Sequence, residues 1–267
     1  MKRLMILAVA ALLAMMFAVA PASAQSDAEI TLIHGIPDTD VDVVVDGAPV
    51  IEAFAFGDTA DLTPFAGATL AGLTVNLAGT DTVAIDIGDF DVPATGNYTV
   101  IAHLSADGTP TVAVFENDTS TIAAGEGRLV VRHTAAAPAV DVLANGDVAF
   151  SNLENPNEVM ADLPAGTISA EVVPTGATEP VVIGPADLPI GEGASLIVYA
   201  VGSLDAGNLS VLTQSIEGLG SAPSAVNTGN SPVSDGASST GLILAIVAGA
   251  AALVIAAPVA RRLVTTR

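Results

Sequence analysis

The 267-residue sequence contains no cysteine and no tryptophan, and aromatic residues make up only 3% of it. Without cysteine there can be no disulfide framework, no thiolate nucleophile and no zinc site with Cys ligands. So few aromatic residues argue against a stacking surface for bases or sugars. Basic residues are also scarce, with 7 against 29 acidic ones and a formal net charge of −22. This composition excludes a basic nucleic-acid interface, so nucleic acid is not an expected partner.

Residues 1–24 have the pattern of a secretory signal peptide. Lys2 and Arg3 precede a long uncharged apolar run, and Ala22-Ser23-Ala24 follows it as a cleavage site. We expect export and cleavage after Ala24, with an uncleaved N-terminal anchor as the alternative.

The other end of the chain predicts a membrane anchor. Residues 241–260 are uncharged and rich in Ala, Leu, Ile and Val, and a helix of this length spans about 30 Å, the thickness of a hydrocarbon core. The tail that follows, residues 261–267, contains three Arg, which the positive-inside rule places in the cytoplasm. The sequence thus predicts a single-pass protein of the cell membrane with its N-terminal ectodomain outside. A degenerate wall-sorting signal is the alternative to a permanent anchor.

The predicted ectodomain is strongly acidic. All 29 acidic residues lie between the signal and the span, where Arg128 and Arg132 are the only basic residues, so this part has a net charge of −27. Such a surface repels anionic lipid and accumulates cations, and it also keeps a protein soluble. Just before the span, residues 219–240 are rich in Ser, Gly, Pro and Asn, which predicts a flexible stalk.

The middle of the chain predicts an all-β fold. Short runs of alternating apolar and polar residues, rich in β-branched side chains, end at Gly, Pro, Asn or Asp about every ten residues. We expect two tandem β-sandwich (Ig-like) modules, at residues 25–119 and 127–218, with the boundary in residues 117–127.

An internal repeat supports two modules. Histidine, Asp-Val and Asx-Gly recur at a constant offset of 99, so the structural repeat positions are His34, Asp42 and Gly47 in the first copy and His133, Asp141 and Gly146 in the second. Further along, Gly96 and the strand after it match Gly193 and its strand at an offset of 97. The Asx-Gly pairs suit type I′ hairpin turns.

These motifs resemble the domain-of-unknown-function 4397 family. Its members open with Arg-Val-His, an Ala- and Pro-rich turn and an Asp-Val strand that ends in a turn with Gly. Residues 131–146 match this pattern well, and residues 33–47 match it with Ile33 in place of the Arg. The resemblance implies a secreted or surface-anchored prokaryotic β domain and brings no established activity.

The histidines are candidates for structural roles. His34 and His133 end strands whose neighbouring residues on the same face are apolar, where a His most often satisfies a backbone group of the adjoining turn. A ligand or catalytic role for this pair is the alternative. The predicted counterpart of His103 in the second copy is Ala200, so we expect His103 to be a surface or packing residue.

Two acidic clusters could hold an oxygen-liganded cation. The candidate metal ligands are Asp38, Asp40 and Asp42 in one cluster and Asp86, Asp89 and Asp91 in the other. Such carboxylates suit Ca²⁺, whereas neither cluster has the spacing of an EF-hand loop. Solvated strand faces and turn-forming Asp residues are the simpler interpretation. Calcium is the one cofactor we consider, and no other is expected.

No hydrolase elbow, zinc-protease helix or phosphate-binding loop occurs in the sequence. We therefore expect a non-enzymatic, membrane-tethered cell-surface protein, a binding, adhesive or envelope-structural module without catalytic residues. Its partner would be an extracellular protein or polysaccharide. The alternatives are a calcium-dependent adhesive module and an extracellular hydrolase.

Overall fold

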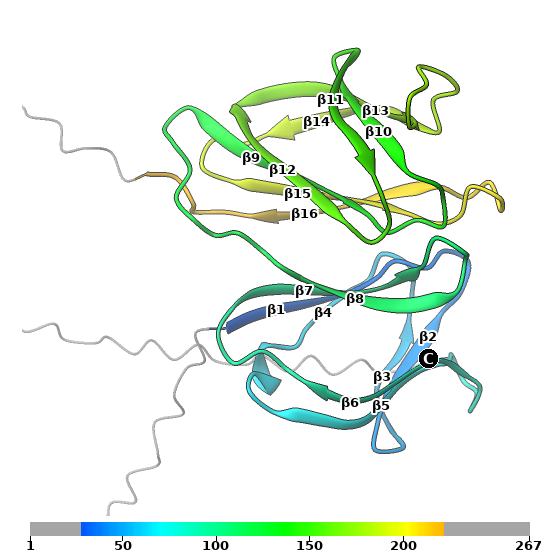
Figure 1. The fold of residues 1–267 in the computed structure, drawn as a ribbon. Coiled ribbons are helices and arrows are strands. Elements are labelled where there is room, and N and C mark those ends of the chain that lie inside the picture. Colours follow the sequence, from blue (N-terminus) through cyan, green and yellow to red (C-terminus); the bar gives the residue numbers. More distant parts are fainter. Residues whose placement is uncertain (1–27, 222–267) are drawn as a thin grey trace, which may run out of the picture. The chain divides into compact units, whose positions relative to one another are not determined.

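The computed structural model describes residues 28–221, which form two successive groups of strands (Figure 1). The first half contains β1 (Ala28–His34), β2 (Val41–Val45), β3 (Ala48–Phe54), β4 (Thr59–Asp61), η1 (Thr63–Phe65), β5 (Thr69–Leu77), β6 (Val83–Asp91), β7 (Gly96–Leu104) and β8 (Pro110–Glu116). The second half contains β9 (Glu126–His133), β10 (Val140–Ala144), β11 (Asp147–Leu153), β12 (Glu158–Pro164), β13 (Gly166–Pro174), β14 (Ile183–Ile190), β15 (Ser195–Val201) and β16 (Ser210–Ile216).

The two halves have the same sheet topology. The sheets of the first half have the orders β4-β1-β7-β8 and β3-β2-β5-β6, and those of the second half have the orders β12-β9-β15-β16 and β11-β10-β13-β14. In each half one pair of strands is parallel, β1 with β7 and β9 with β15. The all-β prediction is confirmed, and the four sheets are consistent with two β-sandwich modules.

Each half has an apolar core between its two sheets. The core of the first half includes Ile30, Leu32, Val41, Val43 and Val100, and that of the second half includes Leu129, Val131, Val140, Val142 and Val198. Successive side chains of a strand point to opposite faces, so the alternating runs in the sequence place one face of each strand in these cores.

A third apolar cluster joins the two halves. It contains Ile33, Ile101 and Phe115 from the first half and Val130, Ile197, Tyr199 and Val201 from the second. The strands β1, β7, β9 and β15 are therefore covered on both faces. This explains why β15 reads as a continuous apolar run without alternation, as strands buried on both sides do.

The predicted repeat offset of 97 in the later strands is wrong. His34 pairs with Ala102 and His133 pairs with Ala200, which sets the offset between β7 and β15 at 98. The counterpart of His103 is thus Val201 and not Ala200. A shift of one residue moves every side chain to the opposite face of the sheet, so the pairing with β1 and β9 decides the alignment.

The segment between the two halves and the residues that follow β16 are hydrogen-bonded to each other. Ile122, in the segment between β8 and β9, is fully buried. Its N–H donates to the carbonyl of Leu219 at 2.8 Å, and its own carbonyl accepts from the N–H of Ser221 at 3.0 Å. The first three residues of the predicted stalk, 219–221, therefore belong to the folded body.

The signal predicted at residues 1–24, the span at 241–260 and the basic tail lie outside the described residues. Within residues 28–221, no helix has the length and apolar character that a membrane crossing requires.

Candidate functional site

The repeated histidines fix the loop that follows the first strand of each half. The Nε2 atom of His34 lies 2.7 Å from the carbonyl oxygen of Thr39, and that of His133 lies 3.0 Å from the carbonyl oxygen of Pro138. The ring of His34 also stacks on Phe54, with 5.8 Å between ring centroids. Burial lowers the pKa of both histidines, because it disfavours the charged imidazolium.

The repeated aspartates connect distant loops. Each oxygen of the Asp42 carboxylate accepts one backbone N–H at 2.8 Å, from Ala53 and from Gly79. The carboxylate of Asp141 accepts from Asn152 and Gly176 at the same distances. These backbone hydrogen bonds lower the pKa of both aspartates, since they stabilise the ionised form.

The repeated glycines form the turns between the second and third strands. Gly47 has a φ of 75° after Asp46 with 49°, and Gly146 has a φ of 89° after Asn145 with 53°. Two successive residues with positive φ are what a type I′ turn requires. All six repeat positions thus serve the local backbone, and their side chains or backbones are already engaged.

The two acidic clusters are not gathered into a cation site. Asp38 is in the loop before β2 and accepts from the side chain of Asn208 at 3.0 Å. Asp89 accepts from the N–H of Gly72 at 3.0 Å, and Asp91 accepts from the hydroxyl of Thr69 at 2.6 Å. Over residues 28–221, no three His, Asp or Glu side chains approach closely enough to hold a metal ion. The remaining members, Asp40 and Asp86, join none of these contacts.

His103 lies at the end of β7 and is 1% exposed. Its Nδ1 atom is 2.9 Å from the carbonyl oxygen of Leu104, and burial lowers the pKa of the ring. Like the other two histidines, it is hydrogen-bonded to a backbone carbonyl.

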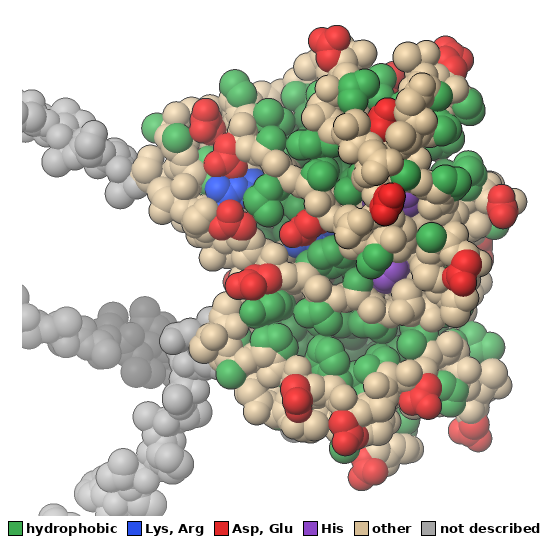
Figure 2. Space-filling model, in the orientation of Figure 1, with side chains coloured by type: hydrophobic (Ala, Val, Ile, Leu, Met, Phe, Trp, Pro, Cys, Tyr) green, Lys and Arg blue, Asp and Glu red, His purple; other side chains and the backbone are tan. Residues whose placement is uncertain are grey.

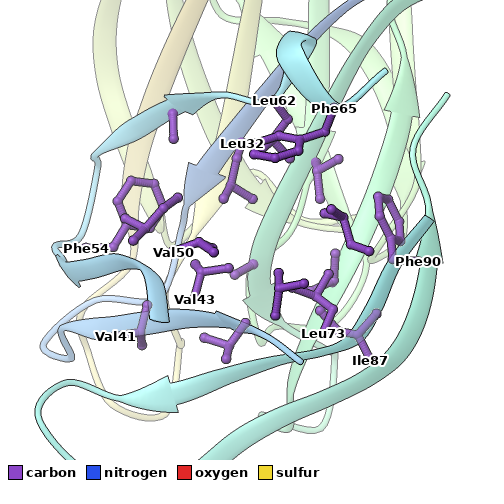
Figure 3. Close-up of a pocket in the computed structure, with 18 of the residues that line it drawn as sticks. Leu32, Val41, Val43, Val50, Phe54, Leu62, Phe65, Leu73, Ile87 and Phe90 are labelled. Atoms are coloured by element: carbon purple, nitrogen blue, oxygen red, sulfur yellow. The ribbon is translucent and has the colours of Figure 1, made fainter. Parts of the chain in front are cut away.

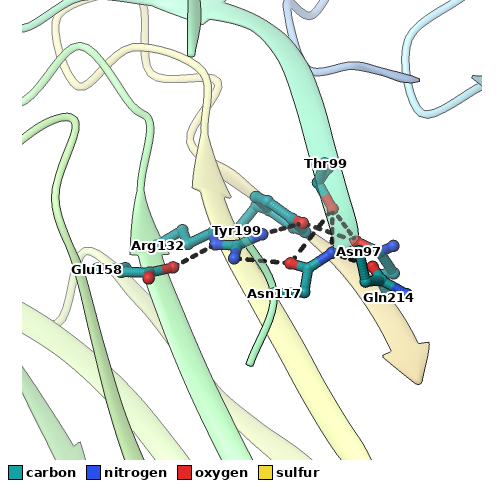
Figure 4. A network of polar contacts seen from close by, with 7 residues as sticks. All are labelled: Asn97, Thr99, Asn117, Arg132, Glu158, Tyr199 and Gln214. Carbon is teal, nitrogen blue, oxygen red and sulfur yellow. Dashed lines mark hydrogen bonds and ion pairs between the residues drawn. The ribbon is translucent and has the colours of Figure 1, made fainter. Parts of the chain in front are cut away.

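A buried polar network crosses between the two halves (Figure 4). Arg132, 1% exposed, donates from Nε to the carboxylate of Glu158 at 2.7 Å. Its other nitrogens donate to the hydroxyl of Tyr199 and to the side-chain oxygen of Asn117, both at 2.8 Å. Asn117 follows β8 of the first half, so the arginine of β9 ties the two halves together.

A second connection completes this network. Thr99 of β7 donates to the side-chain oxygen of Gln214 of β16 at 2.9 Å, and the hydroxyl of Tyr199 donates to the same oxygen at 2.7 Å. Asn117 donates to Asn97 at 2.6 Å. Burial raises the pKa of Tyr199, which keeps its hydroxyl protonated as a donor.

Arg132 also lies against aromatic rings at the junction. Its guanidinium carbon is 4.3 Å from the ring centroid of Phe115 and 5.3 Å from that of Tyr199. Cation–π attraction therefore adds to the hydrogen bonds. The buried charge of Arg132 is therefore satisfied by groups from both halves. These contacts leave the guanidinium without a free face for a ligand.

Between its two sheets, each half also contains an apolar cavity. The cavity of the first half measures about 260 Å³, and labelled side chains from both sheets point into it in Figure 3. The cavity of the second half measures about 290 Å³. Both cavities have the character of small-molecule sites, which are concave and mostly apolar.

The repeat motifs lie in a region that matches a known protein family. Residues 28–143 match the family model described as Domain of unknown function (DUF4397). Residues 28–143 belong to this family. The DUF4397 match runs from β1 into β10 and so includes both histidine–aspartate motifs. A search of curated proteins found no match.

The sequence did not reveal the junction between the two halves or the cavities. One signal for the junction was present, because Ile33 replaces the family's arginine in the first half whereas Arg132 retains it in the second. Which residues surround Arg132 depends on the packing of β8, β12, β15 and β16, and no local pattern encodes that packing.

Proposed function

We propose that this protein is a non-enzymatic, membrane-tethered surface protein that presents two Ig-like β-sandwich modules outside the cell. The signal at residues 1–24 would export it, the span at 241–260 would hold it, and residues 261–267 would remain in the cytoplasm. The modules would serve as a binding, adhesive or envelope-structural element for an extracellular protein or polysaccharide.

The observation that carries this proposal is the charge of the exposed surface. Residues 28–221 contain 27 acidic side chains and two arginines. Both arginines are buried, Arg128 at 5% and Arg132 at 1% exposure. Arg128 is paired with Asp118 at 3.0 Å and with Asp162 at 2.8 Å, and Arg132 is paired with Glu158. Figure 2 accordingly shows scattered acidic side chains and only small basic areas bordered by acidic ones.

A negatively charged surface is suitable for a folded body that is tethered close to an anionic membrane. It repels acidic polymers and its own copies, which maintains solubility and keeps the body away from the bilayer surface. The described histidines support a non-enzymatic role, since each ring is buried and hydrogen-bonded to a backbone carbonyl.

Fractionation of cells that express the full chain tests the proposal. We expect the protein in the membrane fraction and its modules to be degraded when intact cells are treated with protease. A variant that ends at Thr240 is the matched control and should be released into the medium. Recovery of the full chain in the medium, or protection of the modules from protease in intact cells, would contradict the proposal.

A binding assay tests the proposed role of the modules in binding an extracellular protein or polysaccharide. The fragment of residues 25–224, immobilised, should retain a defined purified envelope polysaccharide or surface protein in a saturable manner. If hydrolysis products of such a polymer accumulated instead, the non-enzymatic assignment would be wrong.

A further inference from the structure

We propose that each half binds one small uncharged aliphatic molecule in the cavity between its two sheets. This inference goes beyond surface tethering, because it assigns a ligand class and a stoichiometry of two. It depends on the shape and chemistry of the cavities and holds wherever the chain is located.

The cavity of the first half is lined almost entirely by hydrocarbon. Of its 19 lining residues, Asp61 alone is polar, and the others are Val, Leu, Ile, Ala and Phe. Figure 3 shows Leu32, Val43 and Leu73 directed into it. Two of the lining side chains are strongly exposed, Val50 at 52% and Phe65 at 41%. These exposed apolar side chains mark where the cavity opens to solvent.

The cavity of the second half lies at the equivalent place. Its lining contains no polar side chain at all. Corresponding residues line both cavities, namely Leu32 and Val131, Val43 and Val142, Val50 and Ala149, Val100 and Val198, and Val112 and Val211. A space that is retained in both copies, with changed side chains but similar volume, is a property of the fold and not a packing defect of one copy.

The volumes indicate the size of the guest. An engineered apolar cavity of about 150 Å³ stays free of water and binds benzene, so 260–290 Å³ admits a somewhat larger molecule. Sites for drug-sized ligands begin at about 300 Å³. A helix is about 10 Å across, so neither cavity can hold one, and a single peptide segment could not fill both.

The chemistry of the cavities indicates an uncharged guest. The linings offer no basic group to pair with an anion, and burying a charge without a partner is costly. The net negative surface further disfavours an anionic amphiphile. An alkyl chain with a neutral end, such as a medium-length alcohol, fits both conditions.

Calorimetric titration with 1-octanol tests the proposal. Residues 28–221 lie in one compact unit, and every strand pairs within it, so the fragment 25–224 can be used without detergent. We expect saturable binding of two molecules per chain. Octanoate, which is charged at neutral pH, should bind at least tenfold more weakly.

Exposed positions at the two openings provide matched variants. V50D should abolish the first site and A149D the second, so that each lowers the stoichiometry from two to one. V83D and V148D change exposed valines that line neither cavity, and they should leave it at two. A161L fills the second cavity with the side chain that Leu62 supplies in the first, and it should weaken the second site alone.

Four results would overturn the proposal. Three are the absence of saturable octanol binding in the folded fragment, a stoichiometry that V50D and A149D leave unchanged, and equal binding of octanol and octanoate. Co-sedimentation with neutral phosphatidylcholine vesicles without octanol binding would assign the apolar openings to a bilayer and also overturn it. Since no membrane anchor is present in the fragment, these outcomes are independent of the test of surface tethering.

Discussion

Replacing Arg132 with alanine should destabilise the described body more than most single substitutions. The change removes the ion pair with Glu158, the hydrogen bonds to Tyr199 and Asn117, and the contact with the ring of Phe115. It also leaves the oxygen of Asn117 without its charged donor in a buried place.

The magnitude follows from the burial of the pair. Breaking a buried ion pair by removing one partner costs about 3–5 kcal/mol. The side chain of Glu158 is 26% exposed, so water partly compensates its charge. We therefore expect a loss of stability at the lower end of this range, about 3 kcal/mol. For a folding unit of this size, each kcal/mol lowers Tm by about 2–4 °C, so we expect a decrease of roughly 6–12 °C.

Thermal unfolding of the fragment 25–224, followed by circular dichroism, measures this effect. The double variant R132M/E158Q is the matched control, because it removes both charges and retains much of the packing, and it should be less destabilised than R132A. A Tm of R132A within about 2 °C of the wild type, or a double variant as unstable as R132A, would refute the reasoning.

Three further predictions concern the backbone and the histidines. In D141N the amide can accept only one of the two backbone hydrogen bonds to Asn152 and Gly176, so the urea midpoint should fall, as it should in D42N; an unchanged midpoint in both would show that these bonds do not hold the loops. In G127A a Cβ would lie 2.1 Å from the carbonyl oxygen of Gly191, so unfolding measurements should show a loss of about 3 kcal/mol or more, and a wild-type midpoint would contradict this contact. The pKa of each of the three buried histidines is lowered from 6.5, so the unfolded chain binds protons more readily below that pH. Stability should therefore be complete above pH 6.5 and decrease as the pH falls through the lowered values, and a urea midpoint that stays constant between about pH 7 and pH 5 would contradict the sign.

The sequence predicts well those strands that bury one face in the core of their own half and direct the other face outward. In β2, Val41 and Val43 enter the core while Asp42 points to the loops, as the alternation indicates. In β7 and β15 both faces are covered, so alternation gives no register, and matching Gly96 with Gly193 misaligned the copies by one residue. The parallel pairing with β1 and β9 is a long-range property that a single strand does not encode.

The candidate site was predictable only in part. The sequence identified His34, Asp42 and their counterparts as equivalent, because the offset of 99 is constant. The partners of Asp42 are 11 and 37 residues away in the chain, and no periodicity connects them. The cavities depend on the separation of two sheets, which is set by all their side chains together.

The two halves meet through side chains that differ between them, and this difference determines which surfaces can associate. Ile33 of the first half corresponds to Arg132 of the second, and Phe115 corresponds to Gln214. Two second halves placed face to face would bring two guanidinium groups together without the Phe115 ring that covers Arg132 here. Each half is thus complementary to the other half at this junction and poorly matched to itself, because the side chains that meet there differ between the two.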